Sequence, residues 1–192
     1  MKLLEDRIRR DGIVAPGEVL RIDSFLNHQM DVALLDEMAK EIARLYAADA
    51  VDKVLTVEAS GIAIACLVAL EMGVPMVFAK KSKTSNIPDD LYVAQVKSYT
   101  HGNVNNVVVS KAFLHPGERV LIVDDFLASG EALNGMISLV EQAGATVAGA
   151  AIAVEKAFQP GGAEIRGRGY RVESLARVAS MSVEDGIRFV GE

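Results

Sequence analysis

The apolar residues of the chain recur at helical spacing in some segments and in unbroken or alternating runs in others. Between residues 31 and 46 they fall on one face of a helix, and a short amphipathic helix at 3–10 would end at Gly12. The other expected helices cover 59–73 and 129–143, with a short helical or irregular piece at 161–170. Strands are expected near 19–22 and at 51–58, 75–81, 92–100, 103–114, 117–125 and 146–156, with one or two short strands in the tail.

The order of these elements indicates the fold class. Strands and helices alternate through the middle of the chain, which is typical of an α/β fold with a parallel sheet and helices on both faces. Residues 82–91 form a polar, proline-containing segment that predicts a loop, and the runs on either side of His101-Gly102-Asn103 predict a hairpin. The sequence contains no repeat, low-complexity segment or linker, so we expect residues 1–192 to form one domain.

The composition is that of an ordinary globular protein, because 51% of the 192 residues are hydrophobic and 24% are charged. The net charge of -6 argues against a partner that is nucleic acid. No apolar run is long enough to span a membrane, and the first residues lack the apolar segment of a signal peptide, so we expect a cytoplasmic protein. The one cysteine, Cys66, excludes an internal disulfide, and we expect it to be buried in the apolar run GIAIACLVAL.

Two adjacent acidic residues, Asp124 and Asp125, end the apolar run in the segment VLIVDDFLASGEA. Their charges repel each other, so they either form a solvated acidic turn or face a ligand that compensates them. Ligands of parallel sheets bind beyond the carboxyl ends of the strands, and the small residues 128–130 that follow lead into a helix N-terminus suited to a phosphate. Carboxylates beside a phosphate site suit a sugar phosphate whose hydroxyls they bind and whose developing positive charge they stabilise.

This segment resembles the phosphoribosyl-diphosphate signature of the type I phosphoribosyltransferases, which consists of a hydrophobic strand, two acids and a small Thr-Gly turn. The resemblance implies the fold of that family, an α/β fold with a mainly parallel sheet flanked by helices, and a small hood contributed by residues 1–30 and the C-terminal tail. It implies that Asp124 and Asp125 are catalytic. The implied phosphoribosyl-diphosphate loop consists of Ala128, Ser129, Gly130, Glu131 and Ala132. Ser129 stands where threonine is usual, and the next two residues replace glycine and threonine, so one hydroxyl contact is lost.

Two further segments gain a role from the resemblance. The segment VEASGI lies where the family has its diphosphate loop, with backbone donors at Ala59, Ser60 and Gly61, although the same residues also make an ordinary helix start. Three lysines cluster between residues 80 and 83, before a segment that the family closes over the reacting atoms. The resemblance implies that Lys81 neutralises the leaving diphosphate, and the alternative is a solvated basic turn.

The segments SFLNHQ and VEKAF, with the order of elements over the whole chain, resemble the bacterial members of this family that act on xanthine. The resemblance implies that Leu20, Asn27 and Lys156 contact the base. Xanthine has two exocyclic oxygens, which suit the donors of Lys156 and Asn27, and Lys156 would also favour the deprotonated base. Leu20 or Phe126 can cover the flat face of the ring. Taken alone, Lys156 and Asn27 are equally well a strand-end lysine and a loop-capping asparagine.

The implied reaction joins xanthine to the anomeric carbon of phosphoribosyl diphosphate and gives xanthosine monophosphate and diphosphate, a step of purine salvage. Mg²⁺ would bind mainly through the diphosphate, with no protein ligand assigned to it, and the enzyme would be a homodimer. Relatives that use hypoxanthine, guanine or adenine share the signature and remain alternatives. A purine-responsive regulator on the same fold needs a DNA-binding domain and a basic surface, whereas this chain is acidic and has no helix-turn-helix pattern.

Overall fold

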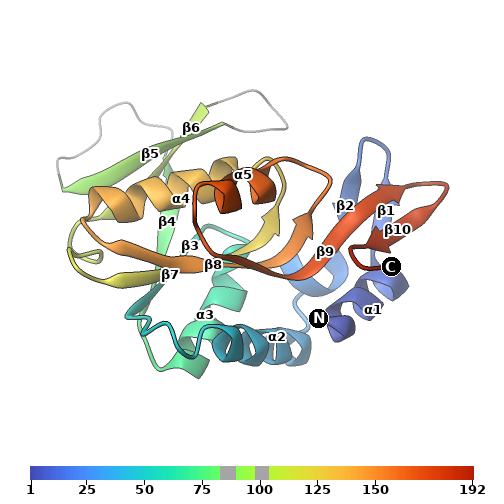
Figure 1. The fold of residues 1–192 in the computed structure, drawn as a ribbon, viewed down its shortest axis with the longest axis horizontal. Coiled ribbons are helices and arrows are strands. Elements are labelled where there is room, and N and C mark those ends of the chain that lie inside the picture. The colour runs from blue at the N-terminus through green and yellow to red at the C-terminus, as the bar shows by residue number, and fades with distance from the viewer. Residues whose placement is uncertain (83–89, 98–103) are drawn as a thin grey trace.

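A computed structural model describes residues 1–82, 90–97 and 104–192 (Figure 1). The helices are α1 (Lys2–Asp11), α2 (Val32–Leu45), α3 (Gly61–Met72), α4 (Glu131–Gln142) and α5 (Gly161–Gly167), with a π-helical turn, η1, at Asp23–Asn27. The strands are β1 (Ile13–Ala15), β2 (Val19–Arg21), β3 (Lys53–Val57), β4 (Met76–Ser82), β5 (Leu91–Lys97), β6 (Val104–Ser110), β7 (Arg119–Leu127), β8 (Thr146–Lys156), β9 (Val172–Ser182) and β10 (Gly186–Phe189).

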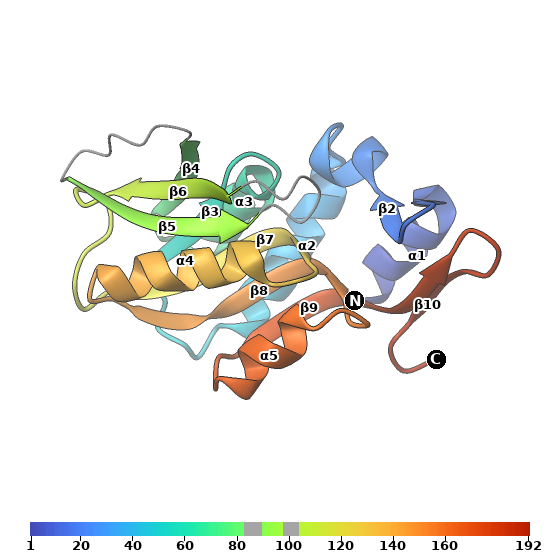
Figure 2. The same cartoon turned by 90° about the horizontal axis from the view of Figure 1, so that it is seen from above.

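The main sheet has eight strands in the order β10-β9-β8-β7-β3-β4-β6-β5. The five strands from β9 to β4 run parallel to one another, while β6, β5 and β10 add antiparallel edges. Helices α4 and α5 cover one face and α2 and α3 the other (Figure 1), and seen from above, α4 lies beside the β5–β6 hairpin (Figure 2). This arrangement confirms the predicted α/β class and the predicted hairpin.

Strand β3 is buried at all five positions, and β7 and β8 on one side of it are nearly so, because helices exclude water from both faces. The sheet therefore separates two apolar clusters. One contains residues of α1, α2 and α3, and the other contains the inner face of α4. Helix α2 begins where the carboxylate of Asp31 accepts the backbone N–H of Leu34 at 3.2 Å, and α3 ends at Gly73, whose φ of 68° favours glycine.

The N-terminal segment lies beyond the edge of the sheet at which β7 and β8 end. Strands β1 and β2 form a separate two-stranded sheet, and α1 packs against β9 (Figure 1). The two ends of the chain meet here, because the guanidinium of Arg9 pairs with Glu192 and stacks over the ring of Phe189 at 4.6 Å. Residues near both termini thus build one region facing the carboxyl ends of the central strands.

Three expectations from the sequence are wrong in detail. Strand β7 does not end at the acidic pair but continues, paired with β8, through Leu127. The tail contains an eleven-residue strand, β9, in place of only short ones. Cys66 is exposed. Helix α3 is apolar around most of its circumference, and it turns Ile64, Ala65, Val68 and Ala69 into the core, so that Cys66 and Leu70 face outwards.

The predicted loop at 82–91 and the tip of the predicted hairpin lie largely outside the described residues. Within the described part of the chain, no helix is both long and apolar enough to cross a membrane.

Candidate active site

Asp124 and Asp125 lie near the carboxyl end of β7, a central strand of the sheet, and both are buried. The Oδ1 atom of Asp124 accepts the backbone N–H of Asp125 at 3.0 Å. On the other side, Oδ2 of Asp125 accepts the side-chain amide of Asn27 at 3.4 Å. The two carboxylates are therefore held by hydrogen bonds, but no salt bridge to either one forms among the described residues.

A cavity of about 280 Å³ opens beside this pair. The residues around it are Val57, Glu58, Ser60, Lys81, Val96, Asn105, Val107, Asp124, Asp125, Phe126 and Ala132. They come from the ends of β3, β4 and β7, from the start of α4 and from the β5–β6 hairpin. The structure thus brings the acidic pair, Ser60, Lys81 and Ala132, which are distant in sequence, to one cavity.

The electrostatics of the cavity are dominated by Asp124. Burial raises the pKa of this carboxyl well above its usual value, and the neighbouring charge of Asp125 raises it further. The backbone N–H of Asp125 and the positive charge of Lys81 act in the opposite direction but do not compensate. A negative charge on Asp124 is consequently unfavourable in the free protein, and a cationic group bound in the cavity would stabilise it.

The loop at residues 128–130 connects β7 to α4 and borders a second cavity of about 190 Å³. All five residues of the predicted phosphoribosyl-diphosphate loop line it, from Ala128 to Ala132, together with Val96, Phe126, Leu127 and Leu133. Gly130 has a φ of 86°, which favours glycine, and α4 begins at the next residue. The first N–H groups of α4 have no partner within the helix and are available to an anion at this point.

The segment at residues 58–61 joins β3 to α3 and faces Asp124. Ser60 lines the larger cavity, whereas Ala59 and Gly61 do not. Gly61 is required by its position, because a Cβ atom there would lie 2.1 Å from Oγ1 of Thr56 and 3.0 Å from Oδ1 of Asp124. The peptide bond between Glu58 and Ala59 is cis.

Glu58 is a site residue that the sequence analysis did not single out. Its Oε1 atom accepts the backbone N–H of Lys81 at 2.6 Å, and its own N–H donates to the carbonyl of Ala79 at 3.0 Å. It thereby joins the segment after β3 to the end of β4. Its position directly after a buried strand, two residues before Ser60, is the signal that could have identified it.

None of the three residues expected to contact the base lines either of these two cavities. Asn27, at the end of η1, reaches Asp125 directly. Lys156, at the end of β8, donates from Nζ to the carbonyl of Glu18 at 2.8 Å. Burial lowers the pKa of Lys156, although the charge of Glu18 partly opposes this effect. Leu20 is buried in the same apolar cluster against which Phe126 packs.

Val96, Val107 and Asn105 belong to the hairpin and also border the larger cavity. Sequence alternation predicted the hairpin strands but not which of their faces would meet β7, since that depends on how β6 pairs with β4. The described residues contain no group of three or more His, Cys, Asp or Glu side chains arranged to hold a metal ion.

Comparison with known proteins agrees with this geometry. Residues 21–164 match the family described as "Phosphoribosyl transferase domain". The chain is 54% identical over 186 residues to a protein of Lachnoclostridium phytofermentans named xanthine phosphoribosyltransferase, covering 97% of this chain and 96% of that protein. It is 52% identical over 187 residues to a protein of the same name from Bifidobacterium adolescentis, covering 97% of each.

Among solved structures, the fold resembles that of the APRTase of Giardia lamblia complexed with 9-deazaadenine. The TM-score is 0.76 at 23% sequence identity, and the match covers 91% of this chain and 97% of the other. The family match extends over most of the chain, and the relatives align with nearly all of it. The chain belongs to the phosphoribosyltransferase family.

Proposed function

We propose that this protein transfers the phosphoribosyl group from phosphoribosyl diphosphate to xanthine, giving xanthosine monophosphate and diphosphate in purine salvage. The observation that carries the proposal is the buried pair Asp124 and Asp125, which faces a cavity beside a helix N-terminus. The high identity to two proteins named xanthine phosphoribosyltransferase supports xanthine as the base, since their names give it as the substrate class.

In this proposal the donor substrate binds across the two cavities. Its 5-phosphate meets the backbone N–H groups and the Ser129 hydroxyl of the loop at 128–132, where α4 begins. The ribose hydroxyls are bound by Asp124 and Asp125. The diphosphate lies towards residues 59–61 and the ammonium group of Lys81, which lines the same cavity as the acidic pair.

The acidic pair is placed to assist departure of the diphosphate. As the bond to the anomeric carbon lengthens, positive charge develops on the ribose, and two carboxylates in a buried setting stabilise it more strongly than water would. The burial and the charge of Asp125 that raise the pKa of Asp124 in the free protein are then offset by the positive charge on the ribose. The chain's contribution is positioning and charge stabilisation, with no covalent intermediate.

The residues fit a magnesium ion held mainly by the substrate. Oxygen donors suit Mg²⁺, and the cavity offers the carboxylates of Asp124 and Asp125. Two carboxylates are too few to hold the ion alone, so the substrate and water would have to supply the other ligands. When bound, Mg²⁺ neutralises charge on the diphosphate and makes it a better leaving group.

The base would bind between the N-terminal region and β7. Asn27 already contacts Asp125, and the half-buried Lys156 projects from the neighbouring strand end. Their N–H groups match the two exocyclic oxygens of xanthine, and Leu20 and Phe126 belong to the apolar cluster on this side. The positive charge of Lys156 would also favour the deprotonated base, which is the better nucleophile.

We further propose a homodimer acting in the cytoplasm. The outward face of α3 supports an interface, because Leu70 is 73% exposed and Cys66 beside it is exposed as well. The cytoplasm is proposed because the donor substrate, which carries both a phosphate and a diphosphate, does not cross a membrane unaided. Light scattering at micromolar concentration is expected to give twice the mass of one 20.5 kDa chain.

The substrate is tested by incubating the protein with phosphoribosyl diphosphate, Mg²⁺ and one purine base at a time, with product identification by mass spectrometry. Xanthine should give xanthosine monophosphate faster than hypoxanthine or guanine gives its nucleotide, and adenine should react least. A faster reaction with any of the other bases would contradict xanthine as the substrate while leaving phosphoribosyl transfer intact.

A further inference from the structure

A buried carboxylate lies next to the phosphate-binding loop and takes no part in the reaction proposed above. Glu155, on β8, is 2% exposed. Its backbone pairs with Leu127 of β7, the residue directly before the loop at 128–132. A charge so deeply buried requires compensation, and its partners come from two other elements of the fold.

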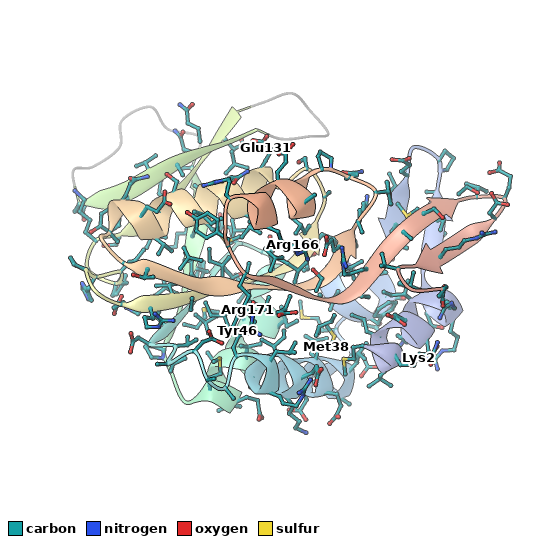
Figure 3. The ribbon with its side chains drawn as sticks, viewed as in Figure 1. Lys2, Met38, Tyr46, Glu131, Arg166 and Arg171 are labelled. Carbon is teal, nitrogen blue, oxygen red and sulfur yellow. The ribbon has the colours of Figure 1, made fainter. Side chains whose placement is uncertain are left out.

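Helix α5 supplies the main partner. Nη1 of Arg166 donates to Oε1 of Glu155 at 2.7 Å and Nη2 to Oε2 at 2.8 Å, so that the two side chains meet as parallel forks. Arg166 also donates to the carbonyl of Val172 from Nη2 at 3.1 Å. Figure 3 places Arg166 between α5 and the sheet. One side chain thus joins α5 to β8 and to the start of β9.

Strand β9 completes the set. Oε2 of Glu155 accepts the hydroxyl of Ser174 at 2.6 Å and Nε of Arg177 at 3.2 Å. Burial alone would raise the pKa of Glu155, but the hydrogen bonds of Arg166 and Ser174 and the charges of both arginines outweigh it and hold this pKa below its usual value. The carboxylate stays ionised and rigidly held at neutral pH.

The other end of α5 touches the phosphate-binding loop. The N–H of Gly161 donates to the carbonyl of Ala128 at 3.1 Å. The contact is close, because a Cβ atom on Gly161 would lie 2.5 Å from the backbone of Ala128, Ser129 and Gly130 alike. A Cβ atom on Gly130 would in turn lie 3.0 Å from Cα of Gly161. The backbone of α5 therefore forms one wall behind the loop.

We propose that Glu155 and Arg166 are positioning residues for binding of the sugar phosphate. Their ion pair holds α5 at a fixed height above β8, and α5 holds the backbone of Ala128 to Gly130 in the conformation that presents its N–H groups to the phosphate. This inference rests on the proposed function, which assigns the loop to the 5-phosphate. Neither residue touches the substrate.

The test compares three variants by two readouts. Arg166→Lys keeps the charge but loses the fork, Gly161→Ala moves the loop directly, and Ser174→Ala removes one hydrogen bond from Glu155. The control is Glu118→Gln, which weakens the 2.6 Å pair between Glu118 and the buried Lys53. This pair lies where β3 and β7 begin, at the opposite ends of the strands from the loop. The readouts are KM for each substrate and the Kd of ribose 5-phosphate by calorimetry.

Arg166→Lys is expected to raise KM for phosphoribosyl diphosphate and the Kd of ribose 5-phosphate by about tenfold, the size of one lost charge-assisted hydrogen bond. Gly161→Ala should raise both at least as much, and Ser174→Ala about twofold to threefold. KM for xanthine should change less than twofold in all three variants. The control should lower the melting temperature and leave both substrate constants unchanged.

A general structural role would give a different result. If Arg166→Lys lowers the melting temperature but leaves the Kd of ribose 5-phosphate unchanged, or raises both KM values equally, the inference is wrong. If Arg166→Lys does not fold, the other two variants decide by the same criteria. A wild-type protein that binds ribose 5-phosphate but forms no xanthosine monophosphate would overturn the proposed function, and the titrations would still test the inference.

Discussion

Two carboxylates on neighbouring strands, both buried at the same edge of the sheet, have opposite surroundings. Glu155 on β8 meets two arginines and a serine, and its pKa lies below the usual value. Asp124 on β7 meets the carboxylate of Asp125, and its pKa lies well above the usual value. Asp124 lies a few residues before the loop at 128–132, and the backbone of Glu155 pairs with Leu127, the residue directly before that loop, so the difference does not arise from their place in the fold.

The difference separates what the fold needs from what the reaction needs. A buried charge is costly, and the folded chain compensates the charge of Glu155 with its own groups because that carboxylate joins three elements. Among the described residues Asp124 has no salt bridge, and the positive charge of Lys81 offsets its burial and the charge of Asp125 only in part. We therefore expect the free protein to be less stable than it would be with a neutral residue there. Such an arrangement persists where a ligand supplies the missing charge.

Substitutions of Asp124 and Asp125 are expected to affect activity more than substitutions around Glu155 do. Replacing both residues, as Asp124→Asn with Asp125→Asn, should lower kcat/KM by about 10²–10³-fold, because loss of a single preorganised electrostatic contact has effects of this size. Steady-state assays with xanthine measure the loss, and circular dichroism should show an unchanged fold. Turnover close to that of the wild type would mean that the pair does not stabilise the reacting ribose.

Substitutions around Glu155 are expected to affect stability more than substitutions of the acidic pair do. Arg166→Ala removes the fork and leaves Glu155 buried with only Ser174 and Arg177, so the free energy of unfolding should fall by about 3 kcal/mol. Urea unfolding measures the change. An exposed pair, Lys40 with Asp36 on α2, is the control, and Lys40→Ala should lower the free energy of unfolding far less than Arg166→Ala does. If Arg166→Ala and Lys40→Ala lose equal amounts of unfolding free energy, the buried ion pair matters no more for stability than an exposed one.

The sequence analysis singled out Asp124 but not Glu155, and the reason is physical. The position of Asp124 near the carboxyl end of a buried strand was predictable, because an apolar strand precedes it in sequence and a small-residue turn follows it, and its role stays a prediction. Glu155 has no such local signal. Its partners lie 11 to 22 residues away on α5 and β9, and nothing in their sequence pattern predicts that they return to β8.

The same reasoning explains which parts of the fold were predictable. Periodicity identified α2, α4, β7 and β8 because each has one face or both faces in the core. It misplaced Cys66, because α3 is apolar around most of its circumference and the sequence does not say which side meets the sheet. It also did not identify Glu58, whose role depends on the pairing of β3 with β4.

Gly61→Ala tests how closely the chain packs against the carboxylate of Asp124. In Gly61→Ala the new Cβ atom would meet Oγ1 of Thr56 and Oδ1 of Asp124, so the backbone of the segment before α3 must shift. We expect a loss of about 1–3 kcal/mol in the free energy of unfolding, typical of overpacking, and a lower kcat. Gly167→Ala is the control, because a Cβ atom there meets nothing within 4 Å. Unchanged stability would mean that the segment adapts freely.

The smallest expected effect comes from neutralising each carboxylate by itself. It compares the two most directly, because it shows whether each negative charge stabilises or destabilises the folded protein. Asp124→Asn removes a charge that burial and Asp125 disfavour, so the variant should be more stable than the wild type by roughly 0.5–2 kcal/mol at pH 8. A carboxyl whose pKa is raised by folding stabilises the folded state below its unfolded pKa, about 3.9, and loses this stabilisation as the pH rises through the folded pKa. The gain from Asp124→Asn should therefore shrink as the pH is lowered towards 4.

Glu155→Gln should change the free energy of unfolding in the opposite direction from Asp124→Asn, and with the opposite dependence on pH. The lowered pKa of Glu155 adds stability above its unfolded pKa, about 4.3, and this stability is lost as the pH falls through the folded value. The variant should be less stable than the wild type throughout the neutral range, and the deficit should narrow only below about pH 4. Urea unfolding of both variants and the wild type between pH 3.5 and pH 8 measures the two curves. If Asp124→Asn is destabilising at pH 8, Asp124 is already compensated in the free protein, and the contrast between the two carboxylates would not hold.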